Sequence, residues 1–517
     1  NINTTSKIKE TSINKTTVSL EKDTKLYLDS ETLNLVKGAT TTINLTYDRT
    51  LGLFPQVTVD NTDVISIKAA TTRITVNALT EGDATIKIVF GGVDYFINVK
   101  VGFDLSKCEY SLKNFDSFDI NCAVNQQIDL SYNLIIGEKE IEGASLEFIN
   151  NDTNEALSSP LFTSSERGTY TFTIKPKYGD IDYKNYYKTL TINVYNTYDS
   201  LTEKSYKYIG RYNQKLNKYR FDNVNSGIEI SFMGSTLDAV VKNESQVKGR
   251  VKVIIDGSYT KYINLENYAE EKHISVEGLS NSIHFARIIN VFEESFTFSL
   301  DLSTIKADAY SELKKRDYTM LVLGDSITCG YGVYGDDPKY EYADSSLAYS
   351  YLIAERLNAD YEMLSSRGIG VMYGHRGEQN MITLYNRASI PDFGKAYENT
   401  SHDIVIINLG TNDGAKLDLY NQDEKGFKGY YYDLLKDVKE DNPDALIFCI
   451  YGMMGIGPDL TNGINYAVDR INSEYQTGMC YSFFNFSIAQ IGHPVIAEHI
   501  IYAEKLYNFM IEKLENR

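Results

Sequence analysis

The 517-residue chain contains no tryptophan and only 8 prolines and 5 cysteines. Any aromatic binding surface must therefore be built from its 41 tyrosines and 22 phenylalanines. Five cysteines do not make a disulfide framework in a chain of this length. Cys108 and Cys122 could pair, whereas Cys329, Cys449 and Cys480 lie in or beside apolar segments and are expected to be buried thiols.

The sequence also lacks a membrane span and a zinc-binding pattern. No apolar run approaches the roughly 20 residues that cross a bilayer, and no cysteine or histidine spacing resembles that of a zinc site. The net charge of −19 would repel a polyanion such as nucleic acid, because binding to phosphates depends on lysine and arginine. Solubility is the simpler reason for the charge itself. We therefore expect no membrane insertion, no nucleic-acid partner and no metal.

The chain is too long for one hydrophobic core, so several domains are expected. Residues 1–23 are polar and predict a tether. Residues 24–101 and 102–196 each contain evenly spaced short strands with turn signals, which is typical of β-sandwiches. Residues 78–84 resemble the turn of bacterial immunoglobulin-like (Ig-like) repeats. We expect two Ig-like modules, with spacing from a cell surface as their first role and binding as their second.

The remaining chain changes its pattern near residue 313. Residues 197–312 consist of predicted strands such as 228–232 and 251–255, and the Asp256-Gly257 pair predicts a tight turn after the second. Residues 313–517 alternate between predicted strands and helices, which indicates a parallel sheet in an α/β domain. A third β-sandwich followed by an α/β domain is therefore expected.

Two helices of the α/β domain have recognisable starts. Helical spacing predicts a helix over 345–357, with Asp344 or Ser345 as its cap. Pro494 occupies a first-turn position of the predicted closing helix. His493 would then stand at the start of that helix, on a loop.

Gly324-Asp325-Ser326 is the most informative segment, because it directly follows the apolar run 320–323. A serine at the carboxyl end of a buried strand lies where ligands bind in open α/β sheets. Its hydroxyl is a weak nucleophile until a base removes its proton, and His493 is the candidate base. This pairing predicts acyl transfer through a serine nucleophile.

Donors for a tetrahedral oxyanion are available on three segments. They are the backbone N–H of Ser326, a glycine N–H and the side-chain amide of Asn412, which follows the apolar run 404–407. A residue without Cβ lets the backbone approach the oxyanion closely. Gly368 is favoured for this role over Gly370.

Four short blocks carry a resemblance to a known family. Gly324-Asp325-Ser326, Gly368, Gly410-Thr411-Asn412-Asp413 and His493 follow the order of the four blocks of SGNH (GDSL-type) hydrolases. The resemblance implies a flavodoxin-like α/β/α domain with a serine nucleophile. It also implies hydrolysis of esters or thioesters without a metal or another cofactor.

One position departs from the family pattern. The last block usually carries Asp-x-x-His, in which the aspartate orients the histidine and stabilises the imidazolium. Gln490 occupies that position here, and its amide oxygen could accept the histidine Nδ1–H. We expect a dyad of Ser326 and His493, with the histidine held by Gln490 or by a backbone carbonyl. Weakened catalysis is the alternative.

The segment before the α/β domain narrows the resemblance. Residues 208–212 and 226–229 resemble the jelly-roll domain of carbohydrate esterase family two, and 324–332 with 344–349 resemble the catalytic domain of that family. The resemblance covers roughly residues 200–517. It implies removal of O-acetyl groups from plant polysaccharides such as xylan or glucomannan, or from their oligosaccharides.

Further residues near these blocks are candidates for lining the substrate site. Tyr331 and Tyr334 follow the nucleophile and could line the site or belong to the core. His375 and Arg376 lie on a predicted loop above the sheet, where an exposed polar loop is the simpler interpretation. Three other titratable residues are expected to be structural: Asp325, Asp413 and His499.

Two other functions stay open. The chain could be an esterase or lipase for other small acyl esters. It could also be a non-catalytic glycan- or surface-binding protein that lost activity with the missing aspartate. The chain starts at Asn1 without methionine, so a signal is expected to have been removed. We expect a secreted or cell-surface bacterial protein, attached through its amino-terminal modules.

Overall fold

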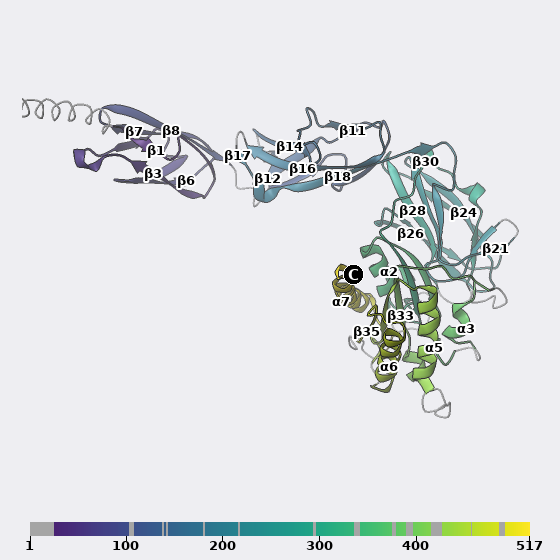
Figure 1. The fold of residues 1–517 in the computed structure, drawn as a ribbon. Helices are drawn as coiled ribbons and strands as arrows, with labels where there is room; N and C mark the ends of the chain where they lie inside the picture. The colour runs from purple at the N-terminus through teal and green to yellow at the C-terminus, as the bar shows by residue number, and fades with distance from the viewer. Residues whose placement is uncertain are drawn as a thin grey trace, which may run out of the picture. The chain divides into compact units, whose positions relative to one another are not determined.

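The computed structural model describes residues 25–102, 108–136, 139–140, 143–178, 181–215, 218–292, 296–335, 342–374, 379–388, 396–414, 426–455, 458–484 and 492–516. The chain divides into two compact units, Asn1–Val194 and Tyr195–Arg517 (Figure 1). Each unit is built around its own hydrophobic cores.

The first unit opens with a two-sheet β-sandwich. One sheet has the strand order β1-β3-β6-β5 and the other β2-β8-β7-β4. Side chains alternate along these strands, as the period of two requires, and Ile43, Ile74 and Ile86 lie in the core between the sheets. The strands are β1 (Tyr27–Leu28), β2 (Thr32–Val36), β3 (Thr40–Thr46), β4 (Gln56–Val59), β5 (Ile65–Ala70), β6 (Arg73–Ala78), β7 (Gly82–Phe90) and β8 (Val93–Gly102).

A second β-rich domain completes this unit. Its main sheet has the order β10-β18-β16-β14, and two smaller sheets, β13-β12-β9 and β11-β15, accompany it. Phe148, Phe172 and Ile192 belong to its core. The strands are β9 (Cys108–Leu112), β10 (Asp119–Ala123), β11 (Ile128–Asp129), β12 (Tyr132–Ile136), β13 (Lys139–Glu140), β14 (Ala144–Asn150), β15 (Leu161–Phe162), β16 (Gly168–Tyr178), β17 (Ile181–Asp182) and β18 (Lys188–Tyr195).

Four of the cysteines, those whose side chains the structure describes, are buried thiols. Cys122 in β10 is free, so the pairing with Cys108 that the sequence left open is not formed. Burial raises the pKa of the Cys122 thiol to about 11, which suppresses the reactive thiolate. Cys329, Cys449 and Cys480 are free and buried, as predicted.

The second unit begins with the third β-sandwich, called the jelly roll below. One sheet has the order β19-β30-β23-β28-β25-β26, the other β21-β22-β29-β24-β27, and Phe232, Val253 and Phe298 lie in the core. The predicted turn at Asp256-Gly257 joins β25 to β26, and both residues have positive φ, 52° and 71°. The strands are β19 (Thr197–Tyr198), β20 (Tyr206–Ile209), β21 (Asn213–Lys215), β22 (Lys218–Phe221), β23 (Gly227–Met233), β24 (Leu237–Asn243), β25 (Gly249–Ile255), β26 (Tyr259–Leu265), β27 (Glu271–Val276), β28 (Ile283–Asn290), β29 (Phe298–Leu300) and β30 (Ala309–Ser311).

The α/β domain is built on a parallel sheet with the order β32-β31-β33-β34-β35. In chain order this is 2-1-3-4-5, the flavodoxin-like arrangement, which opens a ligand crevice at the carboxyl ends of the strands beside the first strand. The predicted fold class is confirmed. The strands are β31 (Tyr318–Gly324), β32 (Ala359–Ser365), β33 (Ile404–Asn408), β34 (Leu446–Ile450) and β35 (Cys480–Phe483).

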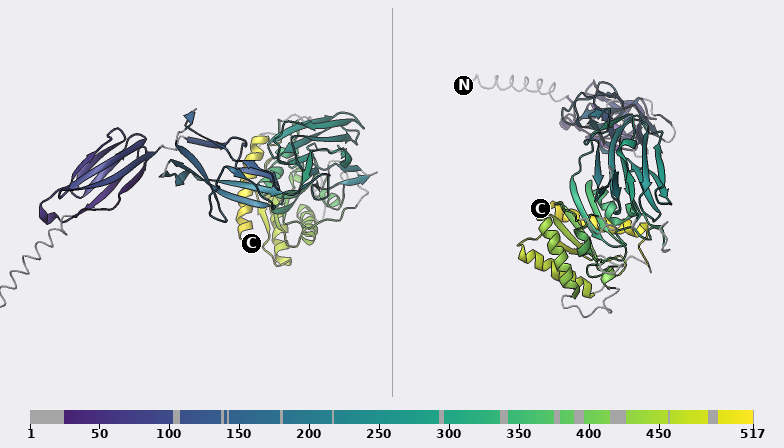
Figure 2. Two further views of the ribbon diagram at one scale, coloured as in Figure 1. Left: turned by 90° about the horizontal axis from the view of Figure 1, so that it is seen from above. Right: turned by 90° about the vertical axis from the view of Figure 1, so that its right-hand side faces the viewer.

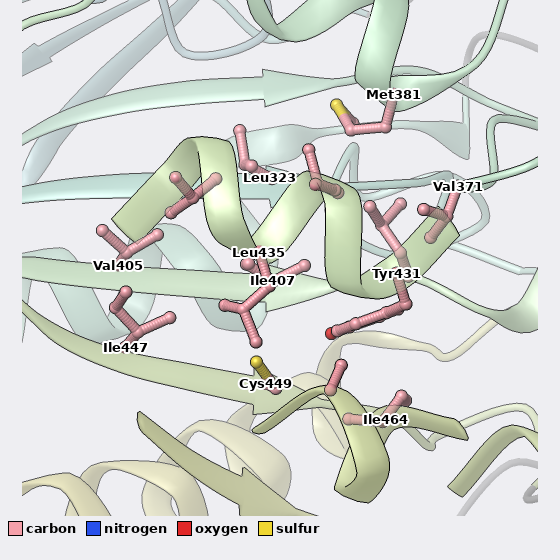
Figure 3. Close-up of a cluster of buried hydrophobic side chains, with 14 of the residues drawn as sticks. Leu323, Val371, Met381, Val405, Ile407, Tyr431, Leu435, Ile447, Cys449 and Ile464 are labelled. Atoms are coloured by element: carbon pink, nitrogen blue, oxygen red, sulfur yellow. The ribbon is translucent and has the colours of Figure 1, made fainter. Parts of the chain in front are cut away.

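Helices cover both faces of this sheet (Figure 2). Side chains from α3, α5 and α6 share one core with the strands, and Figure 3 shows Tyr431 and Leu435 of α5 beside Ile407 of β33. Residues of α2 and α7 share the other core with the opposite sides of the same strands. The helices are α2 (Tyr349–Arg356), α3 (Met381–Tyr385), α4 (Thr411–Gly414), α5 (Gly426–Asp441), α6 (Pro458–Glu474) and α7 (Ile496–Glu515).

Two predicted helix starts were wrong by a few residues. The expected helix over 345–357 divides into a short 3-10 turn, η6 (Ser345–Leu347), and α2. Asp344 caps only the 3-10 turn, where its carboxylate accepts the Ser346 N–H at 2.9 Å. The closing helix α7 begins after Pro494, and Glu498 accepts the Val495 N–H at 2.9 Å.

A buried arginine joins the jelly roll to the α/β domain. Arg211, just after β20, donates from Nε to Glu362 Oε1 of β32 at 2.7 Å. Its Nη1 donates to the carbonyls of Tyr385 and Arg387 at 2.7 and 2.6 Å, and its Nη2 to Asn399 Oδ1 at 3.0 Å. The guanidinium is almost completely buried, so its charge depends on partners within the protein.

Replacing Arg211 by alanine leaves the Glu362 carboxylate buried without its counter-ion. Loss of one partner from a buried pair costs about 3–5 kcal/mol, so we expect Arg211→Ala to lower the free energy of unfolding of the second unit by that amount. Chemical denaturation of the full chain measures the change. The matched control is Arg470→Ala, which breaks the exposed 2.7 Å pair with Glu474 on α6 and should lower the free energy of unfolding far less, because an exposed ion pair contributes little. Equal effects of the two variants would contradict this interpretation.

Candidate active site

Ser326 and His493 meet at the carboxyl end of the sheet. Ser326 is the second residue after β31, and its Oγ lies 2.9 Å from His493 Nε2. The serine side chain is buried and the histidine half-buried. This distance suits transfer of the serine proton to the imidazole during attack on a carbonyl.

The turn that carries the serine is held by its own backbone. The Asp325 carboxylate accepts the Ile327 N–H at 3.0 Å, and the carbonyls of Asp325 and Ser326 accept from Cys329 and Tyr331 at 3.1 Å each. Complete burial raises the pKa of Asp325 to about 7. Asp325 therefore shapes the loop, as the sequence analysis expected.

The loop after the serine reaches the histidine at a glycine. Gly332 has φ of +76°, and a Cβ placed on it would lie 2.8 Å from His493 Cβ. A backbone hydrogen bond also joins this loop to the start of α7: the Ile496 N–H donates to the Val333 carbonyl at 3.1 Å. The missing side chain at Gly332 is thus what lets the two loops come close enough for the serine–histidine contact.

Tyr331 packs against the catalytic-site histidine. The rings of Tyr331 and His493 are edge-to-face, with centroids 4.7 Å apart and an interplanar angle of 68°. Tyr331 is buried, and its hydroxyl accepts a hydrogen bond from Arg367 Nη1 at 3.2 Å. Arg367 also lies over the Tyr331 ring, 5.0 Å from its centroid. Tyr331 therefore contacts the candidate base His493 directly, and it is a buried residue of the site.

Two candidate oxyanion donors lie on segments that contact each other, Gly368 on the loop after β32 and Asn412 in α4. Gly368 has φ of +74°, a conformation that favours glycine. The Gly370 N–H donates to Tyr373 O at 2.6 Å, so Gly368 is the better candidate of the two glycines. Asn412 Nδ2 donates to Ile369 O at 2.8 Å, which fixes its amide next to Gly368.

Asp413 holds the glycine loop in place. Its carboxylate accepts the backbone N–H groups of Val371 and Met372 at 3.0 and 2.8 Å. A Cβ on Gly370 would lie 2.5 Å from the Oδ2 of this carboxylate, which is too close for a side chain. Burial raises the pKa of Asp413. The aspartate is therefore structural, and it links the block that ends β33 to the loop that carries Gly368.

Two family models match the chain over these segments. Residues 322–478 match the GDSL-like Lipase/Acylhydrolase family, and residues 208–309 match the Carbohydrate esterase 2 N-terminal family. The chain carries a carbohydrate esterase 2 N-terminal domain, followed along the sequence by a GDSL-type (SGNH) hydrolase domain. This order of domains is consistent with the architecture of family two carbohydrate esterases.

The chain is similar to longer proteins and matches only part of the length of each. The chain is 26% identical over 302 residues to the cellulase/esterase CelE of Acetivibrio thermocellus, covering 54% of this chain and 36% of that protein. It is 25% identical over 197 residues to an acetylxylan esterase / glucomannan deacetylase of Cellvibrio japonicus, covering 36% of this chain and 53% of that protein. The chain thus spans between a third and about half of these relatives.

Solved structures share the fold of the second unit. A family two carbohydrate esterase from Clostridium thermocellum in complex with cellohexaose has a TM-score of 0.53 and 23% identity, over 60% of this chain and 99% of that chain. An acetyl xylan esterase from the rumen bacterium Butyrivibrio proteoclasticus has a TM-score of 0.55 and 21% identity, over 62% of this chain and 98% of that chain. At these identities the likeness concerns the fold.

Several expectations lie outside the described residues. Gln490, His375 and Arg376 are among them, so their roles stay predictions. Within the described residues, no group of three or more His, Cys, Asp or Glu side chains could hold a metal ion. In the same part of the chain, none of the helices combines the length and apolar character needed to cross a bilayer.

Two contacts between residues far apart in the chain were not predicted from the sequence. Nothing in the segment around Gly368 indicated that the neighbouring Arg367 contacts Tyr331. Arg211 lies inside the segment 208–212 that resembled the jelly roll, but its partners are more than 150 residues away. A charged residue among tyrosines was the one local signal that could have drawn attention to Arg211.

Removing the Tyr331 ring should loosen His493 within the hydrolase site. A misplacement of about 1 Å at a catalytic group can cost on the order of 100-fold in rate. We therefore expect Tyr331→Ala to lower kcat for an aryl acetate by about 10- to 100-fold with a smaller change in KM. Tyr331→Phe keeps the ring and should retain most of kcat. Steady-state kinetics compares the three proteins, and a phenylalanine variant as poor as the alanine variant would argue against ring packing as the cause.

His499 is packed in the core of the hydrolase domain, as expected. It is completely buried, and its Nδ1 accepts the Tyr349 N–H at 3.2 Å. Desolvation lowers the pKa of His499 to about 3, with a further contribution from the nearby His493. The folded protein therefore keeps this imidazole neutral at pH values where the unfolded chain would protonate it.

This difference makes the folded state sensitive to acid. Because the folded pKa lies below the unfolded one, the His499 contribution to stability is complete above about pH 6.5 and falls as the pH decreases toward 3. Between pH 7 and 5 the loss is about 2 kcal/mol. In His499→Gln, whose amide oxygen can accept the Tyr349 N–H, the same decrease in pH should cost correspondingly less. Denaturation at both pH values measures this, and equal pH dependence in the two proteins would contradict it.

Proposed function

We propose that this protein is a carbohydrate O-acetyl esterase that removes acetyl groups from plant polysaccharides such as xylan or glucomannan, or from their oligosaccharides. The observation that carries the proposal is the 2.9 Å contact between Ser326 Oγ and His493 Nε2 inside a GDSL-type domain. The carbohydrate esterase 2 N-terminal domain supports a sugar ester as the substrate. Similarity to the Cellvibrio acetylxylan esterase / glucomannan deacetylase supports acetylated xylan and glucomannan as the substrates.

The reaction begins with acyl transfer to the serine. Ser326 Oγ attacks the acetyl carbonyl carbon while His493 Nε2 accepts the hydroxyl proton. The negative charge that develops on the carbonyl oxygen is stabilised by the N–H groups of Ser326 and Gly368 and by the Asn412 amide. The imidazolium then gives its proton to the sugar oxygen as the C–O bond of the ester breaks, which releases the deacetylated sugar.

Deacylation repeats these roles with water. His493 takes a proton from the water, the resulting hydroxide adds to the acetyl-serine carbonyl, and the same donors hold the oxyanion. The proton returns to Ser326 Oγ as acetic acid leaves, and the acid then ionises to acetate by giving its proton to the solvent. All steps use side chains and backbone of this chain, and atoms and charge balance over the cycle.

The amino-terminal modules belong to the proposal as a means of attachment. We place the protein outside a bacterial cell, where an insoluble plant polysaccharide is accessible, and we assign the first unit the role of a spacer from the cell surface. Its two β-rich domains carry their cores independently of the second unit. The catalytic steps need none of their residues.

The proposal is tested by acetate release from acetylated xylan, acetylated glucomannan and an aryl acetate. Wild-type protein should release acetate from at least one polysaccharide, and Ser326→Ala should lower the rate by about 1,000-fold or more. The matched control is Ser473→Ala, an exposed serine on α6, which should leave the rate unchanged.

Each other outcome points to a different function. Release from the aryl acetate alone would move the enzyme to other small acyl esters. No release from any substrate, combined with binding to a polysaccharide, would favour the glycan-binding alternative. Turnover that persists in Ser326→Ala would contradict the serine mechanism itself.

A further inference from the structure

Two tyrosines from different domains meet beside the nucleophile loop. Tyr262 of β26 belongs to the jelly roll and Tyr334 to the hydrolase domain, and their hydroxyl oxygens are 3.0 Å apart. Both side chains are among the large exposed residues of the described chain, at 38% and 42% exposure. Two aromatic residues thus remain open to solvent at a contact between domains.

Tyr334 lies on the same turn that approaches the histidine. The Gly335 N–H donates to Gly332 O at 2.9 Å, which closes the turn. Gly332 is the residue whose missing side chain makes room for His493. Tyr334 is therefore two residues from the point where the nucleophile loop touches the catalytic histidine. Tyr334 thus belongs to the loop that runs from the nucleophile to the contact with His493.

Buried charged residues hold the Tyr262 side chain in place. Its hydroxyl donates to Asp344 Oδ2 at 2.5 Å, and Lys252 Nζ donates to the same oxygen at 3.2 Å. Asp344 and Lys252 are both buried. The guanidinium carbon of Arg250 and the ammonium of Lys252 each lie 5.1 Å from the centroid of the Tyr262 ring. Tyr262 therefore loses little side-chain entropy on binding, because its position is already fixed.

The contact between domains does not require exposed rings. The jelly roll is already joined to the hydrolase domain by the buried Arg211 cluster and by the Lys252–Asp344 pair. A tyrosine combines a large apolar ring with a hydroxyl that can donate or accept a hydrogen bond. A sugar ring has the matching surface, with C–H groups on its faces and hydroxyls around its edge. Since the chain has no tryptophan, tyrosine is the residue expected at such a contact.

We propose that Tyr262 and Tyr334 together bind a neutral sugar ring of the substrate, on the alcohol side of the ester that Ser326 attacks. The jelly roll then contributes directly to the substrate site, through Tyr262 and the adjacent Arg250. The acetyl group lies against the oxyanion donors, and the sugar rests on the tyrosine pair. This inference rests on the proposed esterase function and adds the position of the sugar.

The test compares two substrates in variants of the full chain. Tyr334→Ala should lower kcat/KM for an acetylated oligosaccharide at least tenfold more than for an aryl acetate, because the aryl ester carries no sugar ring. Tyr334→Phe keeps the ring and should lose less than threefold. Tyr262→Leu should behave as Tyr334→Ala does, and Tyr262→Phe as Tyr334→Phe does. Thermal unfolding of each variant identifies any that fails to fold.

A matched control separates this effect from the loss of any exposed tyrosine. Tyr27 in the first β-sandwich is more exposed than either residue, and Tyr27→Ala should leave both substrates unchanged. Parallel losses on the two substrates, or no loss in Tyr334→Ala and Tyr262→Leu, would overturn the proposal. In that case the tyrosine pair would be a contact between domains only.

A binding measurement distinguishes failure of this inference from failure of the proposed function. Calorimetry with deacetylated xylo- and manno-oligosaccharides can be carried out on Ser326→Ala, with and without Tyr334→Ala. If wild-type protein released no acetate from carbohydrate, weaker oligosaccharide binding in the double variant would still support the tyrosine pair. Binding unaffected by Tyr334→Ala, or no binding, would overturn it whatever the esterase result.

Discussion

The contact between Ser326 and His493 depends on two loops that can touch because Gly332 has no side chain. A Cβ at this position would lie 2.8 Å from the histidine Cβ, so any other residue would separate the loops. The two members of the dyad are 167 residues apart in sequence. Their distance is therefore fixed by how the end of β31 packs against the start of α7. The backbone hydrogen bond from Ile496 to Val333 holds this arrangement.

The jelly roll is structurally continuous with the hydrolase domain. Arg211 reaches Glu362 in β32 and two carbonyls at the end of α3, so it connects the jelly roll with the strand that precedes the Gly368 loop. Asp344 does the same on the other side, where it receives hydrogen bonds from Lys252 and Tyr262. A buried charge is costly unless it is paired. The two domains consequently have to dock correctly before either buried cluster is satisfied.

Local patterns in the sequence were enough for the fold class and for the four blocks around Ser326, Gly368, Asn412 and His493. Apolar runs followed by small residues mark strand ends in parallel sheets, and this rule does not need tertiary contacts. The helix start near Asp344 was misplaced because Asp344 caps a 3-10 turn, after which Ala348 is extended (ψ 154°) before α2 begins. Contacts between residues far apart in the chain leave no repeating pattern in the sequence from which they could be predicted. The structure was needed to bring Tyr331 against His493 and Tyr262 against Tyr334.

The most direct test of the account is to trap the acyl-enzyme. Protein quenched with acid during turnover of an acetyl ester would be digested and mapped by mass spectrometry. The account predicts an acetyl group on the peptide that contains Ser326, formed within one turnover and lost on further incubation. An acetyl group on another residue, or turnover without any acetylated peptide, would contradict a mechanism built on the Ser326–His493 contact.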